Sequence, residues 1–564
     1  MKIFVSGKVY TQSGMKEAFV VDGSRFVYAG SNEEALRYEG DVTDLQGQFV
    51  CAGLNDSHMH LLHFGQALTL ADLSSCTGSR EEMLDGLRSF AAENPVEEGK
   101  WLIGLGFNQD YFSGEKRFPT CRDLDQVSTE YPIMISRACG HMCTVNSKAL
   151  EIMKARGIIR GGNGDSNGGL SGDPNGSFDS KRNGNRNSDS VEGGSVERDE
   201  RGELTGIFWE NAIELVNSCI PPYTIEDMKR MLAAASRWVN RQGITSVQTD
   251  DLVTLPSVDW RLVLQAYQEL KAEGRLTVRV NEQSQLTDRE ALQAFLDEGY
   301  TTNVGDEWFK IGPLKIIGDG SLGARSAYLL EEYADAAGQR GMVVTSLEKM
   351  VDLITLAHTH QMQVAVHAIG DGCVEQVLEA YETVLAEYPR EDHRHGVVHC
   401  QIMRPEHYER FRANGIHAYV QSVFLDYDMK IVEDRVGKSV AESSYGGHSY
   451  FELGISMSNG SDAPVERPIP LNSMQCAVTR RDLACKLAPY RPQEAMTVKE
   501  ALDSYTVGGA YASFEEHVKG DIREGMLADF VVLDRSPFEA EAEELAGLKV
   551  IQTWVDGRCV YCAE

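Results

Sequence analysis

Short apolar runs alternate with helix-length amphipathic segments over most of the chain. The runs fall at 243–250, 276–283, 308–320, 363–372, 395–401, 416–422 and 454–464, and an earlier one starts at Phe49. Segments between them, such as EDMKRMLAAASRWVNRQ and CVEQVLEAYETVLAEY, have the apolar spacing of one helix face. Strands that alternate with helices form parallel sheets. Eight of them predict an α/β fold, a closed (β/α)8 TIM-like barrel, with catalytic groups at the carboxyl ends of its strands.

The two ends of the chain have a different pattern. Residues 1–50 and 520–564 consist of short strand-like runs, with Asp22-Gly23 and Asp556-Gly557 as hairpin signals. Each end is too small for a core of its own. We therefore expect them to form one small composite β-sandwich domain, which leaves residues 51–64 and 226–519 for the barrel.

The interval between the first two barrel strands is too long for a single helix. Residues 65–225 are therefore expected to form an inserted subdomain, a lid over the barrel mouth. Within it, residues from about 160 to 197 are dense in Gly, Asn, Ser and Asp, with almost no large apolar side chain. Such a segment cannot bury enough surface to offset its ordering entropy, which predicts a flexible loop.

The first barrel strand is expected to end in two histidines one residue apart, in FVCAGLNDSHMHLLH. Alternate side chains of a strand share a face, so His58 and His60 can bind one metal ion. An isolated His-x-His pair is more often two surface histidines. Asp56 beside the pair, and further candidate ligands downstream, favour the metal site.

A second His-x-His pair, His358 and His360, has a different interpretation. It follows a helical pattern, in which residues two apart do not share a face. We expect both to be surface residues.

Four later strand ends carry a residue that can take part in a divalent metal site: Lys315, His367, His399 and Asp462. Each stands near the end of an apolar run, where a barrel presents side chains to substrate. A lysine ammonium repels a cation, but a carbamate formed from Lys315 and carbon dioxide is anionic and can bridge two metals. The alternative is a buried lysine paired with Asp319 or Asp462, and the sequence favours neither.

Composition limits the classes of partner that the protein is expected to bind. Lys and Arg total 54 against 85 for Asp and Glu, so the net charge of −31 argues against nucleic acid or an anionic membrane surface as the main partner. The first residues do not resemble a secretory signal, no apolar run is long enough to cross a bilayer, and the twelve cysteines are scattered. We expect a cytoplasmic protein with a small-molecule substrate; a homo-oligomer is left open.

Six motifs are highly specific in combination: GLNDSHMHL, GHMCTVNSKAL, LKIIGDGSLGARSAYL, VAVHAIGDG, HCQIMRPE and SNGSDAPVERPIPL. Together they resemble the amidohydrolase superfamily, and more closely its YtcJ-like branch, which includes N-substituted formamide deformylase. The likeness covers nearly the whole chain outside the polar loop. It specifies the branch but not the substrate.

The resemblance implies a metal site formed by His58, His60, Lys315, His367, His399 and Asp462, with the lysine carboxylated as in many relatives. It also implies that Asp462 handles the proton of the attacking water, and that His141 in the insert reaches the substrate. In the Gly-rich loop after Lys315, Asp319 and Arg325 are further candidates for substrate contact. Neutral imidazoles and a carboxylate suit zinc, as one or two ions.

These expectations lead to a metal-dependent hydrolase of a non-peptide, amide-type C–N bond, for example in an N-substituted formamide. A zinc-type ion lowers the pKa of bound water from about 15.7 toward roughly 7, and Asp462 would pass the water's proton to the leaving amine. Two alternatives are an aminohydrolase that releases ammonia from a heterocycle and a non-catalytic barrel. Retention of all six ligand positions argues against the non-catalytic barrel.

Overall fold

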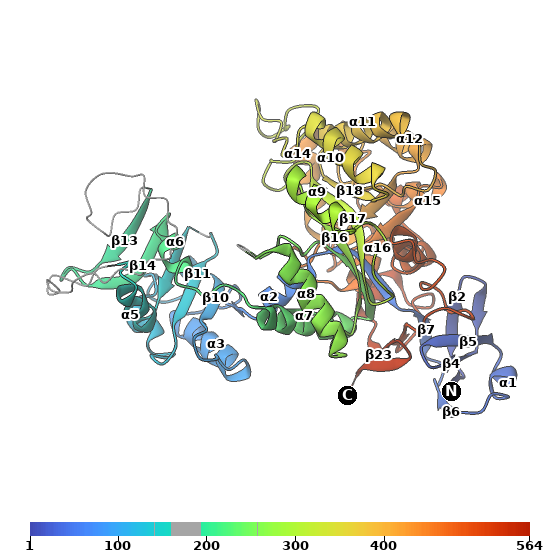
Figure 1. The fold of residues 1–564 in the computed structure, drawn as a ribbon, viewed down its shortest axis with the longest axis horizontal. Helices are drawn as coiled ribbons and strands as arrows, with labels where there is room; N and C mark the ends of the chain where they lie inside the picture. Colours follow the sequence, from blue (N-terminus) through green and yellow to red (C-terminus); the bar gives the residue numbers. More distant parts are fainter. Residues whose placement is uncertain (140, 160–192, 256–257, 564) are drawn as a thin grey trace. The chain divides into compact units, whose positions relative to one another are not determined.

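The structure is a computed structural model that describes residues 1–139, 141–159, 193–255 and 258–563 (Figure 1). The chain divides into two compact units, Met1–Gly65 with Thr224–Glu564, and Gln66–Tyr223. Most of the polar segment expected as a loop, residues 160–192, lies outside the described residues. Its expected end at 197 is wrong, because Gly194–Arg198 forms strand β13. Among the described residues, no helix has the length and hydropathy needed to span a membrane.

An eight-stranded parallel sheet, nearly closed into a barrel, lies at the centre of the first unit. In sheet order its strands are β8 (Leu54–Met59), β15 (Ile244–Thr249), β16 (Arg279–Ser284), β17 (Phe309–Ile317), β18 (Val364–Ala368), β19 (Gly396–His399), β20 (His417–Val420) and β21 (Met457–Asn459). Every predicted run after the first overlaps one of these strands. The predicted (β/α)8 fold is confirmed.

Helices lie between successive strands of this sheet along the chain, and others follow its last strand, β21. The longer ones are α7 (Ile225–Asn240), α8 (Trp260–Ala272), α9 (Arg289–Asp297), α10 (Leu347–Thr359), α11 (Asp371–Glu387), α12 (Pro405–Asn414) and α16 (Pro470–Thr479). Shorter ones are α2 (Leu61–Leu68), which follows β8, and α13 (Leu425–Asp428), α14 (Val432–Ala441), α15 (His448–Glu452), α17 (Val498–Ser504) and α18 (Val507–Ala512). Figure 1 shows α9 to α12 beside β16 to β18.

Hydrogen bonds join the first barrel strand to the segment that follows the last one. The N–H of Asp462 donates to the carbonyl of His58 at 2.8 Å, and the N–H of His60 donates to that of Ala463 at 2.8 Å. Residues far apart in the sequence are thereby fixed side by side at the carboxyl end of the barrel.

Both ends of the chain contribute to two small sheets. The larger has the order β24-β23-β22-β7-β2-β3 and the smaller β5-β4-β1-β6. Their strands are β1 (Lys2–Val5), β2 (Lys8–Thr11), β3 (Gly14–Lys16), β4 (Ala18–Asp22), β5 (Arg25–Gly30), β6 (Asp41–Asp44), β7 (Phe49–Ala52), β22 (Phe530–Leu533), β23 (Val550–Val555) and β24 (Arg558–Cys562); a short helix, α1 (Asn32–Ala35), follows β5. Phe4 and Phe19 of the smaller sheet lie 5.2 and 4.9 Å from Phe530 of the larger, ring to ring. The two sheets share one core, as the predicted composite β-sandwich requires.

The first apolar run is two strands rather than one continuous strand. β7 pairs with β2 and β22 in the sandwich, whereas β8 pairs with β15 in the barrel. The chain changes sheet at Gly53, whose N–H donates to the carbonyl of Asp529 at 2.9 Å. A Cβ at this position would lie 2.1 Å from Thr245 Oγ1. Only glycine allows the two strands to approach so closely.

The second unit has a sheet and a core of its own. Its strands, in the order β13-β14-β12-β11-β10-β9, are β13, β14 (Leu204–Glu210), β12 (Met142–Val145), β11 (Ile133–Arg137), β10 (Leu102–Phe107) and β9 (Ala71–Asp72). The helices of this unit are α3 (Arg80–Glu93), α4 (Cys121–Leu124), α5 (Ser147–Ala155) and α6 (Ile213–Asn217). Leu84 and Leu87 of α3 are fully buried in a cluster with Ile133 and Ile135 of the sheet.

His358 is buried, contrary to the prediction, whereas His360 is exposed as expected. His358 Nε2 donates to the carbonyl of Tyr388 at 2.8 Å, and its Nδ1 lies 2.8 Å from His395 Nε2. The two histidines lie on different faces of the helix, as expected, and the face that carries His358 is turned toward the core.

Candidate metal centre

All six predicted ligands lie at the carboxyl end of the barrel. His58, Lys315, His367 and His399 are on β8, β17, β18 and β19, while His60 directly follows β8 and Asp462 follows β21. His58 and Lys315 are each only 1% exposed, Asp462 is 8% exposed, and His60 and His367 are half-buried. The set is therefore largely screened from solvent but retains an open side.

The four histidines form a continuous row of rings. Ring centroids are 5.3 Å apart for His60 and His58, 5.6 Å for His58 and His399, and 4.4 Å for His399 and His367. The row joins both predicted halves of the site, the first-strand pair and the histidines of β18 and β19.

Asp462 lies against the first-strand pair. Its Oδ1 is 3.3 Å from His58 Nε2 and 3.1 Å from His60 Nε2. Burial alone would raise the pKa of this carboxyl, but the adjacent His58 and His60 imidazoles outweigh burial and hold its pKa well below the usual range. Both Asp462 and His399 have left-handed backbones, with φ of 60° and 84°. Strained backbones of this kind concentrate at functional sites.

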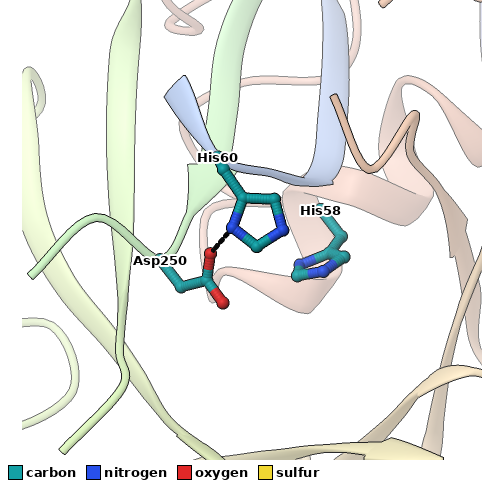
Figure 2. Close-up of side chains that lie close together, drawn as sticks. All are labelled: His58, His60 and Asp250. Atoms are coloured by element: carbon teal, nitrogen blue, oxygen red, sulfur yellow. Dashed lines mark ion pairs between the residues drawn. The ribbon is translucent and has the colours of Figure 1, made fainter. Parts of the chain in front are cut away.

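Asp250, which directly follows β15, completes the centre, and the sequence analysis missed it. Figure 2 shows its carboxylate beside His60, and Asp250 Oδ1 forms an ion pair with His60 Nδ1. Donor atoms of His58, His60 and Asp250 all lie within 4.8 Å of one another. The signal was present, because Asp250 ends the run GITSVQTD just as the other ligands end theirs.

Lys315 lies next to both groups. Its Nζ is 2.9 Å from His58 Nε2 and 3.6 Å from Asp250 Oδ2. Among the described residues, Asp250 is the one carboxylate within 4.0 Å of that nitrogen. The pairing with Asp319 or Asp462 considered from the sequence is therefore wrong. Burial lowers the pKa of Lys315, which favours the neutral amine that carbon dioxide can attack. The carbamate stays a prediction.

Two glutamines fix the orientation of the imidazoles. Gln283 Oε1 lies 3.0 Å from His58 Nδ1, and Gln421 Oε1 lies 2.8 Å from His399 Nδ1. An amide oxygen only accepts, so each histidine carries its proton on Nδ1 and presents the lone pair of Nε2 to the centre. Burial lowers the pKa of both histidines, which keeps them neutral. Both are therefore in the form that binds a metal.

This set of donors fits a divalent cation. The buried carboxylate of Asp250 meets His60 Nδ1 at Oδ1, and its Oδ2 has no hydrogen-bond donor among the described residues. Burying a carboxylate with so few partners is costly unless a cation lies close to it. Imidazoles combined with carboxylates are ligands that zinc and related divalent ions accept.

His367 is held by the loop that follows Lys315. Its Nε2 lies 3.2 Å from the carbonyl of Gly320 and 3.4 Å from Asp319 Oδ1. Asp319 is 1% exposed, and its Oδ2 accepts the N–H groups of Tyr328 at 2.8 Å and Gly370 at 2.9 Å. The structure thus places Asp319 as a buried anchor beside His367. Both carboxylate oxygens of Asp319 are already engaged, so its predicted contact with substrate is not supported.

The two remaining candidates have ion-pair partners. Arg325, in the same loop as Asp319, has its Nη2 2.8 Å from Asp335 Oδ2. His141 belongs to the second unit, where its exposed side chain has Nδ1 2.9 Å from Glu210 Oε2. That hydrogen bond raises the pKa of His141. For both residues, substrate contact stays a prediction.

Comparisons with known proteins agree with this geometry. A model of the Amidohydrolase family matches residues 41–182 and 178–561. The chain is 30% identical to the YtcJ protein of Bacillus subtilis (strain 168), over 99% of each chain. It is 26% identical to N-substituted formamide deformylase of Arthrobacter pascens, over 97% of this chain and 95% of that one. The crystal structure of an uncharacterized metal-dependent hydrolase from Pyrococcus furiosus superposes with a TM-score of 0.73 at 26% identity, covering 95% of this chain and 100% of that one.

Proposed function

This chain belongs to the amidohydrolase family, and we propose that it hydrolyses an amide-type, non-peptide C–N bond of a small molecule, with N-substituted formamides as the first class to test. The family match and the metal-dependent hydrolase that it resembles support a metal-dependent amidohydrolase. The observation that carries the proposal is the convergence of four imidazoles, Lys315 and two carboxylates at one end of the barrel. The likeness to the Arthrobacter formamide deformylase supports the choice of formamides.

We further propose that the ion is zinc. His58, His60, His367, His399, Asp462 and Asp250 would hold it, with Lys315 contributing once it is carboxylated. A bound zinc ion supplies Lewis acidity, which polarises a carbonyl oxygen and makes water acidic near neutral pH. Asp250 orients His60 by accepting from its Nδ1, and Gln283 and Gln421 do the same for His58 and His399.

Asp462 is the group that accepts and returns the proton. Its pKa lies well below the usual range, so it is ionised at neutral pH and can accept a proton from water. A carboxylic acid at the open side of the centre can then protonate the departing amine. Without this second transfer the amine would leave as an anion, which is a far worse leaving group. The carboxylate of Asp462, flanked by two imidazoles, can thus act first as the base and then as the acid.

Hydrolysis of N-benzylformamide tests the proposal. Zinc-loaded protein is expected to release formate and benzylamine in equal amounts, and protein stripped with a chelator is expected to regain turnover when zinc is added. Asp462→Ala serves as the catalytic control, with retained zinc measured separately. Formate without dependence on metal would contradict the proposal. Inactivity on N-formyl and N-acyl amines, together with ammonia release from heterocyclic amines, would favour an aminohydrolase instead.

A further inference from the structure

A small cavity, about 20 Å³ in volume, is lined by His399 of the metal centre and by Arg480. His399 lines one part of it, and the other lining residues include Gln421, Ser422 and Tyr445. His399 ends β19, Gln421 and Ser422 follow β20, Tyr445 lies between α14 and α15, and Arg480 is the C-cap of α16. The cavity therefore links a metal-centre histidine to a buried positive charge.

Arg480 is a buried cation with no carboxylate partner among the residues that the structure describes. Its side chain is among the largest that are fully buried, with the residue 2% exposed. Nε donates to the carbonyl of Tyr490 at 3.1 Å and Nη2 to that of Tyr445 at 2.7 Å. Among the described residues, Nη1 has no hydrogen-bond partner and no carboxylate lies within 4.0 Å of the guanidinium. One donor of a buried charge is thus left for a ligand.

The charged groups near Arg480 do not supply the missing anion. Arg491 adds a second positive charge, and the carboxylate of Glu494 is engaged by Arg491 at 3.0 Å. The hydroxyl of Tyr445 donates to Asp428 Oδ2 at 2.7 Å, whereas the backbone carbonyl of Tyr445 accepts from Arg480. Burial lowers the pKa of Arg480 to about 10, so the group is still a cation at neutral pH. A buried, unpaired charge is costly unless an anion compensates it.

The backbone of Arg480 itself is strained. The residue has a φ of 56°, in the left-handed region that favours glycine. An arginine there has a backbone cost that a glycine would not have. Ser422 adds a second donor, because its Oγ accepts from Asn459 Nδ2 at 2.8 Å and its hydroxyl proton has no acceptor among the described residues.

We propose that Arg480, with the hydroxyl of Ser422, binds a carboxylate group carried by the substrate, so that the preferred substrates are N-formyl or N-acyl amines that bear a carboxylate. The planar guanidinium and a hydroxyl suit a carboxylate, which accepts hydrogen bonds on both oxygens. A cavity of this size has room for only a small group beside the guanidinium, so we expect the acid to be compact. This inference rests on the proposed function, since it assigns a substrate class to the same metal centre.

Kinetics on matched substrates test the inference. N-formylglycine and N-formyl-β-alanine are compared with their neutral amides, which keep the scissile bond and change only the carboxylate. We expect kcat/KM at least about 10-fold higher for the better acid than for its amide, the size of effect expected for a hydrogen bond to a charged group. The two acids differ by one methylene, so the ratio of their kcat/KM values reports the distance between the metal centre and Arg480. Equal kcat/KM for acids and amides would overturn the inference while leaving the proposed function intact.

The Arg480→Gln variant is expected to bring the acid-to-amide ratio close to one. Arg261→Gln is the matched control, because Arg261 on α8 carries an exposed charge paired with Glu298. Its ratio should equal that of the wild type. A wild-type ratio in Arg480→Gln would overturn the inference.

Binding to metal-free protein separates the inference from the chemistry. We expect N-formylglycine, but not its amide, to raise the melting temperature of the chelator-stripped wild type. Sodium chloride at the same ionic strength is the control for a site that binds any inorganic anion. An equal rise of the melting temperature with chloride would overturn the substrate assignment. Because no turnover is required, the measurement is informative even for a protein that does not hydrolyse formamides or for an Arg480→Gln chain that folds poorly.

Discussion

At the scale of single residues, the centre depends on which ring nitrogen of each histidine carries its proton. Gln283 and Gln421 hold His58 and His399 by Nδ1, while Asp250 holds His60 by Nδ1. Partners of this kind are as important to a metal site as its ligands, because a rotated or protonated imidazole has no lone pair to offer.

Gln421→Met is expected to weaken metal binding. The substitution preserves size but removes the oxygen that accepts from His399 Nδ1, so the ring loses its orientation. We expect the dissociation constant for zinc to rise about 10- to 100-fold. Competition with a chromophoric chelator measures it, and Gln265→Met on the exposed face of α8 is the control. Unchanged affinity in Gln421→Met would show that the hydrogen bond does not orient the ligand.

At the scale of elements, the sequence predicted the positions of the barrel strands but not the side-chain contacts between them. The barrel strands were found from apolar runs, and the position of each ligand at a strand end followed from the fold. Gln283 and Gln421 were missed because their contacts depend on the registers of separate strands, which no local pattern records. Gly53 was missed as a strand boundary because the close approach of Thr245 that requires it comes from the second barrel strand.

Buried histidines between α10 and β19 illustrate the same limit. His393 Nδ1 accepts the N–H of His395 at 2.9 Å, and its Nε2 donates to the carbonyl of Asn414 at 2.9 Å. Protonation would remove the first bond. Burial lowers the pKa of His393 to about 4. Nothing in the run EDHRHGVVH distinguishes these histidines from ligands or from surface residues.

The stability of the protein is therefore expected to fall in mild acid. The unfolded chain binds a proton at His393 near pH 6.5, while the folded chain does not until about pH 4, so the unfolded state gains free energy as the pH falls between these values. Between pH 7 and pH 5 the loss from this residue is ~2 kcal/mol. Urea titration of metal-free protein measures it, and His393→Gln should reduce the dependence on pH. The exposed His517→Gln control should not, and equal slopes in all three proteins would contradict the assignment.

At the scale of the whole molecule, residues distant in the sequence bind the barrel to the β-sandwich. Arg279, at the start of β16, donates from Nε to Asp529 Oδ2 at 2.6 Å and from Nη2 to Oδ1 at 3.0 Å. Both residues are almost fully buried. That the two ends of the chain would form one β-domain was predictable from their size and strand pattern. The ion pair was not, because 250 positions separate its members.

Asp529→Ala is expected to destabilise the protein by about 3–5 kcal/mol, because it leaves Arg279 buried without its main partner. The double variant Arg279→Met, Asp529→Leu should recover most of that loss, since it removes both charges and retains apolar volume. Urea unfolding of the three proteins at one pH measures the differences. If Asp529→Ala lost no stability, the pair would not hold the barrel and the sandwich together.

The metal content of the purified protein tests the central claim most directly. Elemental analysis of the wild type, loaded with zinc and dialysed, is expected to find at least one tightly held ion per chain. His58→Ala, with its fold verified by circular dichroism, should lose it, and the exposed His360→Ala control should retain it. A wild type that holds no divalent metal, or a His58→Ala variant that holds as much as the wild type, would contradict the account.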